Sequence, residues 1–380
     1  MITQSQASPC VVCGASRWTA LPDPAGQSMA SDWRVVGEPL ARHACGACGL
    51  VRRWPGETAD ETLYATGYGL YAHVAGDARE RARQAQYAAW IASYVPHAPA
   101  RVLDVGCGNG SLLLALGERW PSALLAGCDP SAESVAHGAA PGLHLWQGTA
   151  ANLPAGAVSD LVVSVNVIEH TRDPVAFLRG LRGALADGGV LILVCPDGGQ
   201  PGLELLFADH VFSFAPEHLH ALCVRAGLAV DSAGTAPAAL GAFQSVVARP
   251  AAPRDVPAAI AAVSPAGRAR YLEAWGRLDA RLLERVDAPA VCFGAGEAAG
   301  LLRAYAPQTW ARVRACTIDG PVTGRFGELP IIGLDRVGAG ETVLLGVRPL
   351  DQPAVAARLG ARFPRVAAWY DLLDGGDGGG

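Results

Sequence analysis

The stretch that most constrains the fold is RVLDVGCGNGSLLL, which spans residues 101–114. A short apolar run ends in a glycine-rich turn, and the turn passes directly into a leucine-rich segment with helical periodicity. This order predicts a buried strand, a tight turn and the N-terminus of a helix, an arrangement that lets backbone amides approach a bound nucleotide. Glycine suits the turn because a Cβ would block either a positive φ angle or the ligand. We therefore expect an α/β fold with a ligand site at this turn.

Two acidic residues accompany the turn. Asp104 precedes the glycines in the spacing D-x-G-x-G-x-G, and Asp129 ends the next apolar run. A carboxylate at Asp129 suits a ribose, because it can accept hydrogen bonds from two vicinal hydroxyls. The two acids and the turn together resemble motifs I and II of the class I S-adenosylmethionine (SAM) methyltransferases, over roughly residues 80–250. A Rossmann dehydrogenase is the alternative for the same glycines.

The resemblance implies a SAM site along the carboxyl ends of the first strands. The residues that match the family's cofactor site are Asp104, Gly106, Gly108, Asn109, Gly110, Asp129, Ala150 and Asn166. In many methyltransferases an acid in a later loop meets the adenine amino group, but this chain has Thr149 at that position. We therefore expect the adenine contact to come from the backbone of Ala150.

Two C-x-x-C pairs near the N-terminus indicate a metal site. Cys10 and Cys13 form the first pair, Cys45 and Cys48 form the second, and a glycine directly follows each pair. Such knuckles supply four thiolates for tetrahedral Zn²⁺, and four sulfur ligands leave no open position for catalysis. We expect a structural zinc ion. The alternatives are four unrelated thiols or a redox pair.

The composition limits the partners and the compartment. The net charge is −5 and the sequence contains no lysine, which disfavours a general binder of nucleic acid or of anionic membranes. An anionic small substrate is compatible with a few arginines placed locally. No apolar run approaches the ~18 residues of a membrane-spanning helix, and the N-terminus does not resemble a signal peptide. Ten cysteines that include two metal-binding C-x-x-C pairs suit a reducing compartment, so we expect a cytoplasmic protein. We also expect it to be a monomer or a homodimer.

The chain divides into zones by composition and periodicity. We predict a zinc module over residues 1–55, a tyrosine-rich connector over 56–99, a SAM-binding domain over 100–250, a linker and helix over 251–287, a Rossmann-like domain over 288–373 and a disordered tail over 374–380. Alternating strands and helices in the SAM-binding domain indicate a mostly parallel sheet covered on both faces. Gly294 and Gly296 could mark a second dinucleotide site, but a third glycine at the expected spacing is missing, so we expect a degenerate unit that helps to bind substrate.

The order of zinc module, SAM fold and Rossmann-like unit resembles the nucleotide-sugar C-methyltransferases. The resemblance implies that a base removes a proton from the carbon beside a ketone, because a C–H carbon is not nucleophilic until deprotonated. The family's Tyr-x-Glu-His segment matches Phe207, Asp209 and His210, so His210 with Asp209 is the candidate base and Phe207 lacks the family's hydroxyl. The alternative for His210 is a cap on the helix that follows. His218 and His220 on that helix are interpreted as surface or packing residues.

Three further residues match positions of the family: His170, which follows a core strand and is expected to face the methyl donor, and Tyr68 and Tyr71, which match a tyrosine-rich segment that lines the sugar site. Glu169-His170 is widespread among methyltransferases of every substrate type, so anchoring of the loop is the alternative role. The two tyrosines lie in the connector, where they could form a substrate lid or pack a crossover.

The sequence therefore predicts a SAM-dependent methyltransferase that C-methylates a nucleotide-linked keto or deoxy sugar. Because the family's tyrosine hydroxyl is missing, O- or N-methylation of a sugar or other small metabolite is the alternative. One rival from another class is a non-catalytic scaffold or nucleic-acid module, which the acidic net charge and the intact Asp104, glycine turn and Asp129 disfavour. The other is an oxidoreductase that uses the C-terminal glycines.

Overall fold

The computed structural model describes residues 8–54, 78–138, 140–154, 156–252, 260–320 and 324–373. They belong to two compact units, each drawn from separate stretches of the chain. The first unit takes its residues from Met1–Thr19, His43–Glu204 and Asp209–Pro265, and the second from Ala20–Arg42, Leu205–Ala208 and Ala266–Gly380. No described helix is both long and apolar enough to cross a membrane.

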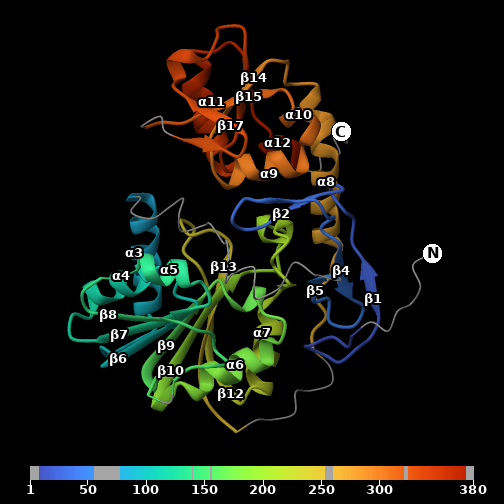
Figure 1. The fold of residues 1–380 in the computed structure, drawn as a ribbon. Helices are drawn as coiled ribbons and strands as arrows, with labels where there is room; N and C mark the ends of the chain where they lie inside the picture. Colours follow the sequence, from blue (N-terminus) through green and yellow to red (C-terminus); the bar gives the residue numbers. More distant parts are fainter. Residues whose placement is uncertain are drawn as a thin grey trace. The chain divides into compact units, whose positions relative to one another are not determined.

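A seven-stranded sheet is the centre of the first unit (Figure 1). Its order is β12-β13-β10-β9-β6-β7-β8. The strands are β6 (Arg101–Val105), β7 (Leu124–Asp129), β8 (Leu143–Gln147), β9 (Ser159–Val165), β10 (Leu185–Pro196), β12 (Leu228–Thr235) and β13 (Phe243–Pro250). The pairs from β8 to β10 are parallel, and β13 runs antiparallel to both of its neighbours. The expected mostly parallel α/β sheet is therefore confirmed.

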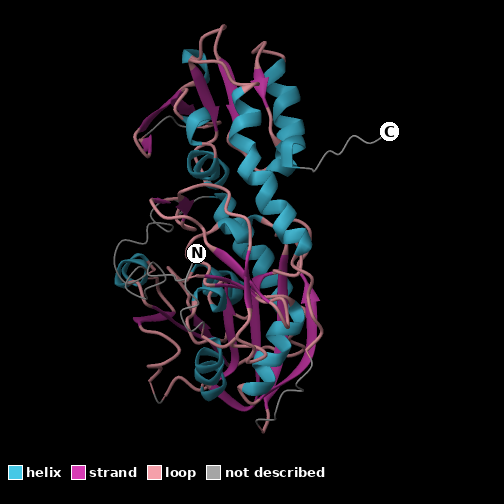
Figure 2. Ribbon diagram, turned by 90° about the vertical axis from the view of Figure 1, so that its right-hand side faces the viewer, coloured by secondary structure: helices cyan, strands magenta, loops and turns pink. Residues whose placement is uncertain are grey.

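Apolar side chains cover both faces of this sheet because alternate residues of each strand point to opposite sides. On β9, Leu161 and Val163 join a core with α3 (Ala78–Ala92) and α4 (Ser111–Arg119). Val162 points the other way, into a core with α6 (Pro174–Gly183) and α7 (Pro216–Arg225). Figure 2 shows helices on both sides of the strands. The carboxyl ends of the strands, where ligands bind in such sheets, carry the predicted SAM residues.

A second sheet of the first unit joins the cysteine knuckles to a distant segment. Its order is β1-β4-β5-β11, with β1 (Trp18–Ala20), β4 (Arg42–Cys45), β5 (Val51–Arg53) and β11 (Phe212–Ser213). The last strand comes from far along the chain, and Phe212 pairs with Arg52 while Ser213 pairs with Val51. The region predicted as a self-contained zinc module over residues 1–55 thus depends on a strand from outside that region.

The second unit is a smaller α/β fold. Its six-stranded sheet has the order β16-β17-β15-β14-β18-β19. The strands are β14 (Ala290–Phe293), β15 (Val313–Thr317), β16 (Arg325–Phe326), β17 (Leu329–Ile332), β18 (Thr342–Leu345) and β19 (Val366–Ala367). All pairs except β16–β17 are parallel. The helices are α8 (Ala266–Leu283), α9 (Glu297–Tyr305), α10 (Pro307–Trp310), α11 (Gln352–Gly360) and α12 (Tyr370–Leu373).

Residues 20–42 belong to this second unit, although the sequence placed them in the zinc module. Their hairpin of β2 (Ser28–Met29) and β3 (Val35–Val36) packs on α9. The contact needs Gly300, since a Cβ there would lie 2.6 Å from the Met29 sulfur. Leu205–Ala208 joins the same unit because the Arg42 guanidinium donates to the carbonyls of residues 205 and 207, at 3.0 and 2.7 Å.

Candidate functional site

The glycine turn after β6 adopts a conformation that other residues rarely reach. Gly106, Gly108 and Gly110 have φ angles of +85°, +53° and +74°, in the left-handed region that favours glycine. The amides of Gly106 and Cys107 both donate to the Cys128 carbonyl, at 2.8 and 3.0 Å. A Cβ on Gly106 would lie 2.2 Å from a methyl carbon of Val167. The turn is therefore closed tightly against the segment that follows β9.

The two predicted acids lie at this turn. Asp129 accepts hydrogen bonds from the amides of Gly108 (2.8 Å) and Ser131 (2.9 Å), which fix its carboxylate beside the glycines. Asp104 is only 2% exposed, and its Oδ1 has no hydrogen-bond partner among the described residues. The same is true of the Asn166 Oδ1 atom, on a residue whose φ is +57°. Buried polar atoms are rarely left unsatisfied in proteins, so these two oxygens point to a ligand.

Burial and the nearby Asp129 charge raise the pKa of Asp104 to about 8. Burial also raises the pKa of Asp129, against the two amides that lower it. A positively charged ligand would offset the cost of two buried carboxylates. SAM fits these acceptor oxygens, because its ribose offers hydroxyl donors and its α-ammonium group and sulfonium carry positive charge. Asn109 contributes differently: its side chain accepts from the Ser111 amide and hydroxyl at the start of α4.

The raised pKa of Asp104 predicts a pH effect on the SAM-free protein. The folded state holds this proton more tightly than the unfolded state, so the stabilisation is complete below the ordinary pKa and is lost as pH rises through about 8. Between about pH 5 and about pH 9 the melting temperature should fall more for the wild type than for Asp104→Asn. At about pH 9 the free energy of unfolding of Asp104→Asn should exceed that of the wild type by at least about 1 kcal/mol. Parallel melting curves for both proteins would contradict the assignment.

The loop after β8 lies beside Asp129, as the cofactor prediction requires. The Gly148 amide donates to the Asp129 carbonyl at 3.0 Å, and the Asn152 side chain accepts from the Thr149 amide at 2.6 Å. Ala150 is buried, with its carbonyl close to Gly180 of α6, where a Cβ would lie 2.2 Å from that oxygen. The adenine contact from the Ala150 backbone stays a prediction.

Two histidines from distant parts of the sequence meet after β9. The rings of His170 and His210 are edge to face, with centroids 4.7 Å apart and planes at 86°. His170 belongs to a short 3-10 turn, η1 (Ile168–His170), that begins directly after Val167. Its Nδ1 lies 3.0 Å from the Asp209 carbonyl, which can only accept, so Nδ1 donates and Nε2 carries the lone pair. His170 thus lies on the segment that packs against the glycine turn, and His210 contacts it there.

Three acids surround this pair, and their arrangement corrects one prediction. Asp209 is adjacent to His210 in sequence but directs its carboxylate to His170, with Oδ2 3.8 Å from Nδ1. The acid that faces His210 is Glu204, whose Oε2 is 3.7 Å from its Nδ1 and whose Oε1 accepts from the Ser213 hydroxyl at 2.6 Å. The sequence analysis missed Glu204, because GLELLF gives no signal that separates it from a surface acid.

Glu169 is the third acid, and its side chain is buried. It is 2% exposed, its Oε1 lies 4.0 Å from His170 Nε2, and neither carboxylate oxygen has a hydrogen-bond partner among the described residues. Donor atoms of Glu169, His170 and His210 all lie within 4.8 Å of one another. Burial raises the pKa of Glu169 to about 7, while burial and the His210 charge lower the pKa of His170. Such a cluster of buried ionisable groups is typical of a catalytic site.

Other predicted residues have different outcomes. Tyr68 and Tyr71 lie outside the described residues. Phe207 is buried in the second unit, where it bridges to Met29. His220 is exposed, as expected, whereas the structure gives the neighbouring His218 a specific role: it is fully buried, and its Nδ1 accepts from the Ala215 amide at 3.0 Å. The cap on α7 that was the alternative role of His210 is therefore made by His218.

The four knuckle cysteines converge in the structure. The sulfurs of Cys10 and Cys48 are 3.6 Å apart, and so are those of Cys13 and Cys45. Zn–S bonds of about 2.3 Å in a tetrahedron require sulfurs about 3.8 Å apart, whereas a disulfide requires about 2 Å. The Cys48 thiol, with the amides of residues 12 and 13, lowers the pKa of Cys10 to about 5 and favours the thiolate. The donor set fits a structural zinc ion.

The two knuckles have the same backbone conformation. In each, the amide of the following glycine donates to the carbonyl of the first cysteine, at 2.8 Å from Gly14 to Cys10 and 2.9 Å from Gly49 to Cys45. Both glycines have a φ of +75°, which explains why a glycine follows each pair.

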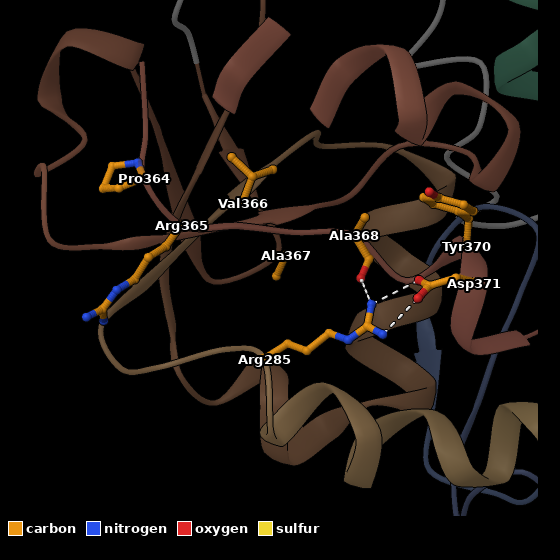
Figure 3. Close-up of a pocket in the computed structure, with 8 residues that line it drawn as sticks. All are labelled: Arg285, Pro364, Arg365, Val366, Ala367, Ala368, Tyr370 and Asp371. Carbon is orange, nitrogen blue, oxygen red and sulfur yellow. Dashed lines mark hydrogen bonds and ion pairs between the residues drawn. The ribbon is translucent and has the colours of Figure 1, made fainter. Parts of the chain in front are cut away.

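A cavity of about 400 Å³ in the second unit does not contain this chemistry. Figure 3 shows the Arg285 guanidinium directed at the Asp371 carboxylate. The two make a bidentate ion pair at 2.8 and 2.9 Å. Arg365, on the same wall, is paired with Asp287 at 2.8 Å. Because both cations are compensated by acids, we assign no anion site to this cavity.

Comparison with known proteins agrees with the site after β6 and β9. A family model described as a methyltransferase domain matches residues 79–233. These residues form a class I SAM-dependent methyltransferase domain. The matched range contains the glycine turn, both acids and the histidine pair.

Relatives of this methyltransferase domain act on different acceptors, as their names state. Trans-aconitate 2-methyltransferase of Rhodopseudomonas palustris is 35% identical over 116 residues, which cover 30% of this chain and 45% of the relative. Malonyl-[acyl-carrier protein] O-methyltransferase of Herminiimonas arsenicoxydans is 34% identical over 141 residues, 35% of this chain and 54% of the relative. The chain thus spans about half the length of these curated relatives. The CcbJ methyltransferase structure from Streptomyces caelestis is 17% identical with a TM-score of 0.40, covering 51% of this chain and 100% of that one.

Proposed function

We propose that this protein transfers a methyl group from SAM to a small acceptor that loses a proton to the histidine pair. The observation that carries the proposal is the contact of His210 with His170, which lies three residues after Val167, the residue that packs on Gly106 of the cofactor turn. A proton acceptor is thereby held next to the expected methyl donor. The family match over residues 79–233 supports the donor assignment.

In this mechanism the cofactor is held by the chain's own buried groups. Asp129 would accept from the ribose hydroxyls, and Asp104 with the Asn166 amide oxygen would face the positively charged groups of the cofactor. When bound, SAM supplies a methyl group on a sulfonium that is already activated for in-line transfer. The protein then needs only to align the acceptor and remove its proton.

His210 is the proposed base. The acceptor's C–H or O–H proton passes to the His210 imidazole, and the electron pair left behind forms the new bond to the methyl carbon as the C–S bond breaks. Glu204, held by Ser213, stabilises the imidazolium that results. His170 keeps a lone pair on Nε2, 4.0 Å from Glu169 Oε1, because its Nδ1 donates to the Asp209 carbonyl.

For the acceptor we propose a nucleotide-linked keto or deoxy sugar, methylated on carbon. The order of zinc knuckles, methyltransferase domain and second α/β unit supports this class. O- or N-methylation of a sugar or other small metabolite is the second candidate, favoured by Phe207, which has no hydroxyl to polarise a ketone, and by the O-methyltransferase among the relatives.

A mass-shift screen of nucleotide sugars with SAM tests this function. The expected result is one product heavier by a methyl group, with NMR showing the methyl on carbon and solvent exchange of the neighbouring proton. A methyl on oxygen or nitrogen would select the second candidate. Calorimetry with SAM and, separately, with NADH supplies the control: binding of NADH without SAM would overturn the methyltransferase proposal and restore the oxidoreductase.

A further inference from the structure

The segment that carries the proposed base continues directly into the knuckle sheet. Val211 accepts a backbone hydrogen bond from Arg53 at 2.9 Å, and the next two residues form β11 against β5. A two-residue strand has little stability of its own. The position of β11, and of His210 beside it, therefore depends on the sheet that the cysteine knuckles hold.

The register of β11 also determines the acid that faces the base. Ser213 pairs with Val51 in the sheet, and its hydroxyl donates to Glu204 at 2.6 Å. Glu204 in turn lies 3.7 Å from His210 Nδ1. Because residues i and i+1 of a strand point to opposite faces, a slip of one residue would turn Ser213 away from Glu204.

His218 makes a second link, from the start of α7 to the second knuckle. Its Nδ1 accepts from the Ala215 amide, so the proton lies on Nε2, which donates to the Cys48 carbonyl at 3.0 Å. The residue is fully buried. This hydrogen bond holds the backbone of a predicted zinc ligand, and such contacts around a metal site orient the residues that bind the metal.

Arg52 makes a third link, through charge. It lies on β5 opposite Phe212. Its guanidinium carbon is 3.9 Å from the ring centroid of Trp18 and 4.0 Å from that of Trp54. It also interacts electrostatically with Cys10 and Cys45. Its Nε and Nη2 are buried without a hydrogen-bond partner among the described residues. Four thiolates around Zn²⁺ leave two negative charges, which would compensate this buried cation.

We propose that the zinc knuckles hold the acceptor half of the active site: metal binding orders β11 and, through His218, the first turn of α7, and so positions Glu204 and His210. His218 is a positioning residue. The inference deepens the proposed function and rests on it for its activity readout. The cofactor half is separate, because the hydrogen bonds that shape the glycine turn come from Cys128 and Asp129 rather than from the knuckles. Loss of metal should therefore impair methyl transfer but not SAM binding.

The test compares three variants of α7 with the wild type. His218→Phe removes both hydrogen bonds, His218→Gln can keep both, and His220→Gln is the exposed control on the same helix. We expect His218→Phe to lose about tenfold in kcat, with faster amide exchange over residues 211–214, one bound zinc and unchanged SAM affinity. His218→Gln should restore most of kcat, and His220→Gln should match the wild type.

Removal of the metal from the wild type by a chelator is the second arm. The amide exchange rates of residues 211–214 should increase. The exchange rates of residues 101–110 and the SAM affinity should stay within about twofold of the values for the zinc-bound protein, well under the tenfold expected if the glycine turn depended on the metal. This readout needs no substrate, so it separates the inference from the proposed function. If His218→Phe does not fold, chelation and His218→Gln decide the question. No change at residues 211–214 after zinc loss, or full methyl transfer without zinc, would overturn the inference.

Discussion

Replacing His210 with asparagine is expected to reduce methyl transfer by about 10²–10⁴-fold, the usual contribution of a general base, while SAM binding is retained. The reason is the geometry after β9: the His210 ring meets His170 edge to face and has Glu204 3.7 Å from its Nδ1. Asparagine has a similar polarity but cannot take up a proton. Single-turnover rates measure the loss, and calorimetry with SAM measures the retained binding.

Two further variants control this result. His220→Asn makes the same change on an exposed residue of α7 and should leave the rate unchanged. Glu204→Gln removes the charge that faces His210 and should lower the rate by less than His210→Asn does. Wild-type turnover in His210→Asn would remove His210 from the mechanism and leave His170 as the base.

The cofactor half of the site could be predicted from the sequence because its signals are local. The turn, both acids and the strands on either side lie within one stretch, and their spacing follows from backbone geometry. The structure places Asp129 on the Gly108 amide and leaves Asp104 buried without a partner for Oδ1. The metal site could likewise be predicted from the two C-x-x-C pairs, since each pair forms a short turn with its own glycine.

The acceptor half could not be predicted in the same way, because its contacts join distant segments. Glu204 lies 3.7 Å from His210 and is held there by Ser213, whose strand pairs with a strand near the N-terminus. Sequence adjacency suggested Asp209 as the partner of His210, but neighbouring residues point in different directions and Asp209 faces His170. The burial of His218 depends on Cys48, 170 residues away. No periodicity within α7 encodes that contact.

The extent of the zinc region was misjudged for a related reason. Residues 20–42 lie between the two knuckles in sequence, and proximity suggested one module. They pack instead on α9, where Gln27 donates to the carbonyls of Arg303 and Ala304. A two-stranded hairpin has little stability of its own, so its position depends on the unit on which it packs, and its own residues do not specify that unit.

Replacing Gly106 with alanine is expected to destroy the cofactor site. The added Cβ would meet a positive φ of +85° and a methyl carbon of Val167 at 2.2 Å. Backbone strain of about 1–2 kcal/mol and overpacking of about 1–3 kcal/mol should together lower the free energy of unfolding by roughly 2–5 kcal/mol. SAM affinity should fall at least about tenfold, because relief of the collision must displace either the turn or the segment after β9. Chemical denaturation and calorimetry measure the two effects.

Gly142 supplies a matched control, since its φ is +87° but nothing lies within 4 Å of the position that a Cβ would occupy. Gly142→Ala should therefore lose only the strain of about 1–2 kcal/mol and bind SAM normally. In the Gly106→Ala/Val167→Ala double variant the colliding methyl group is gone, so part of the stability and of the SAM affinity should return. Equal losses in the two single variants would mean that φ strain alone matters. Normal SAM binding by Gly106→Ala would mean that the cofactor does not lie at this turn. The contact of His210 with His170, after the segment that packs on the turn, would then carry no argument for methyl transfer.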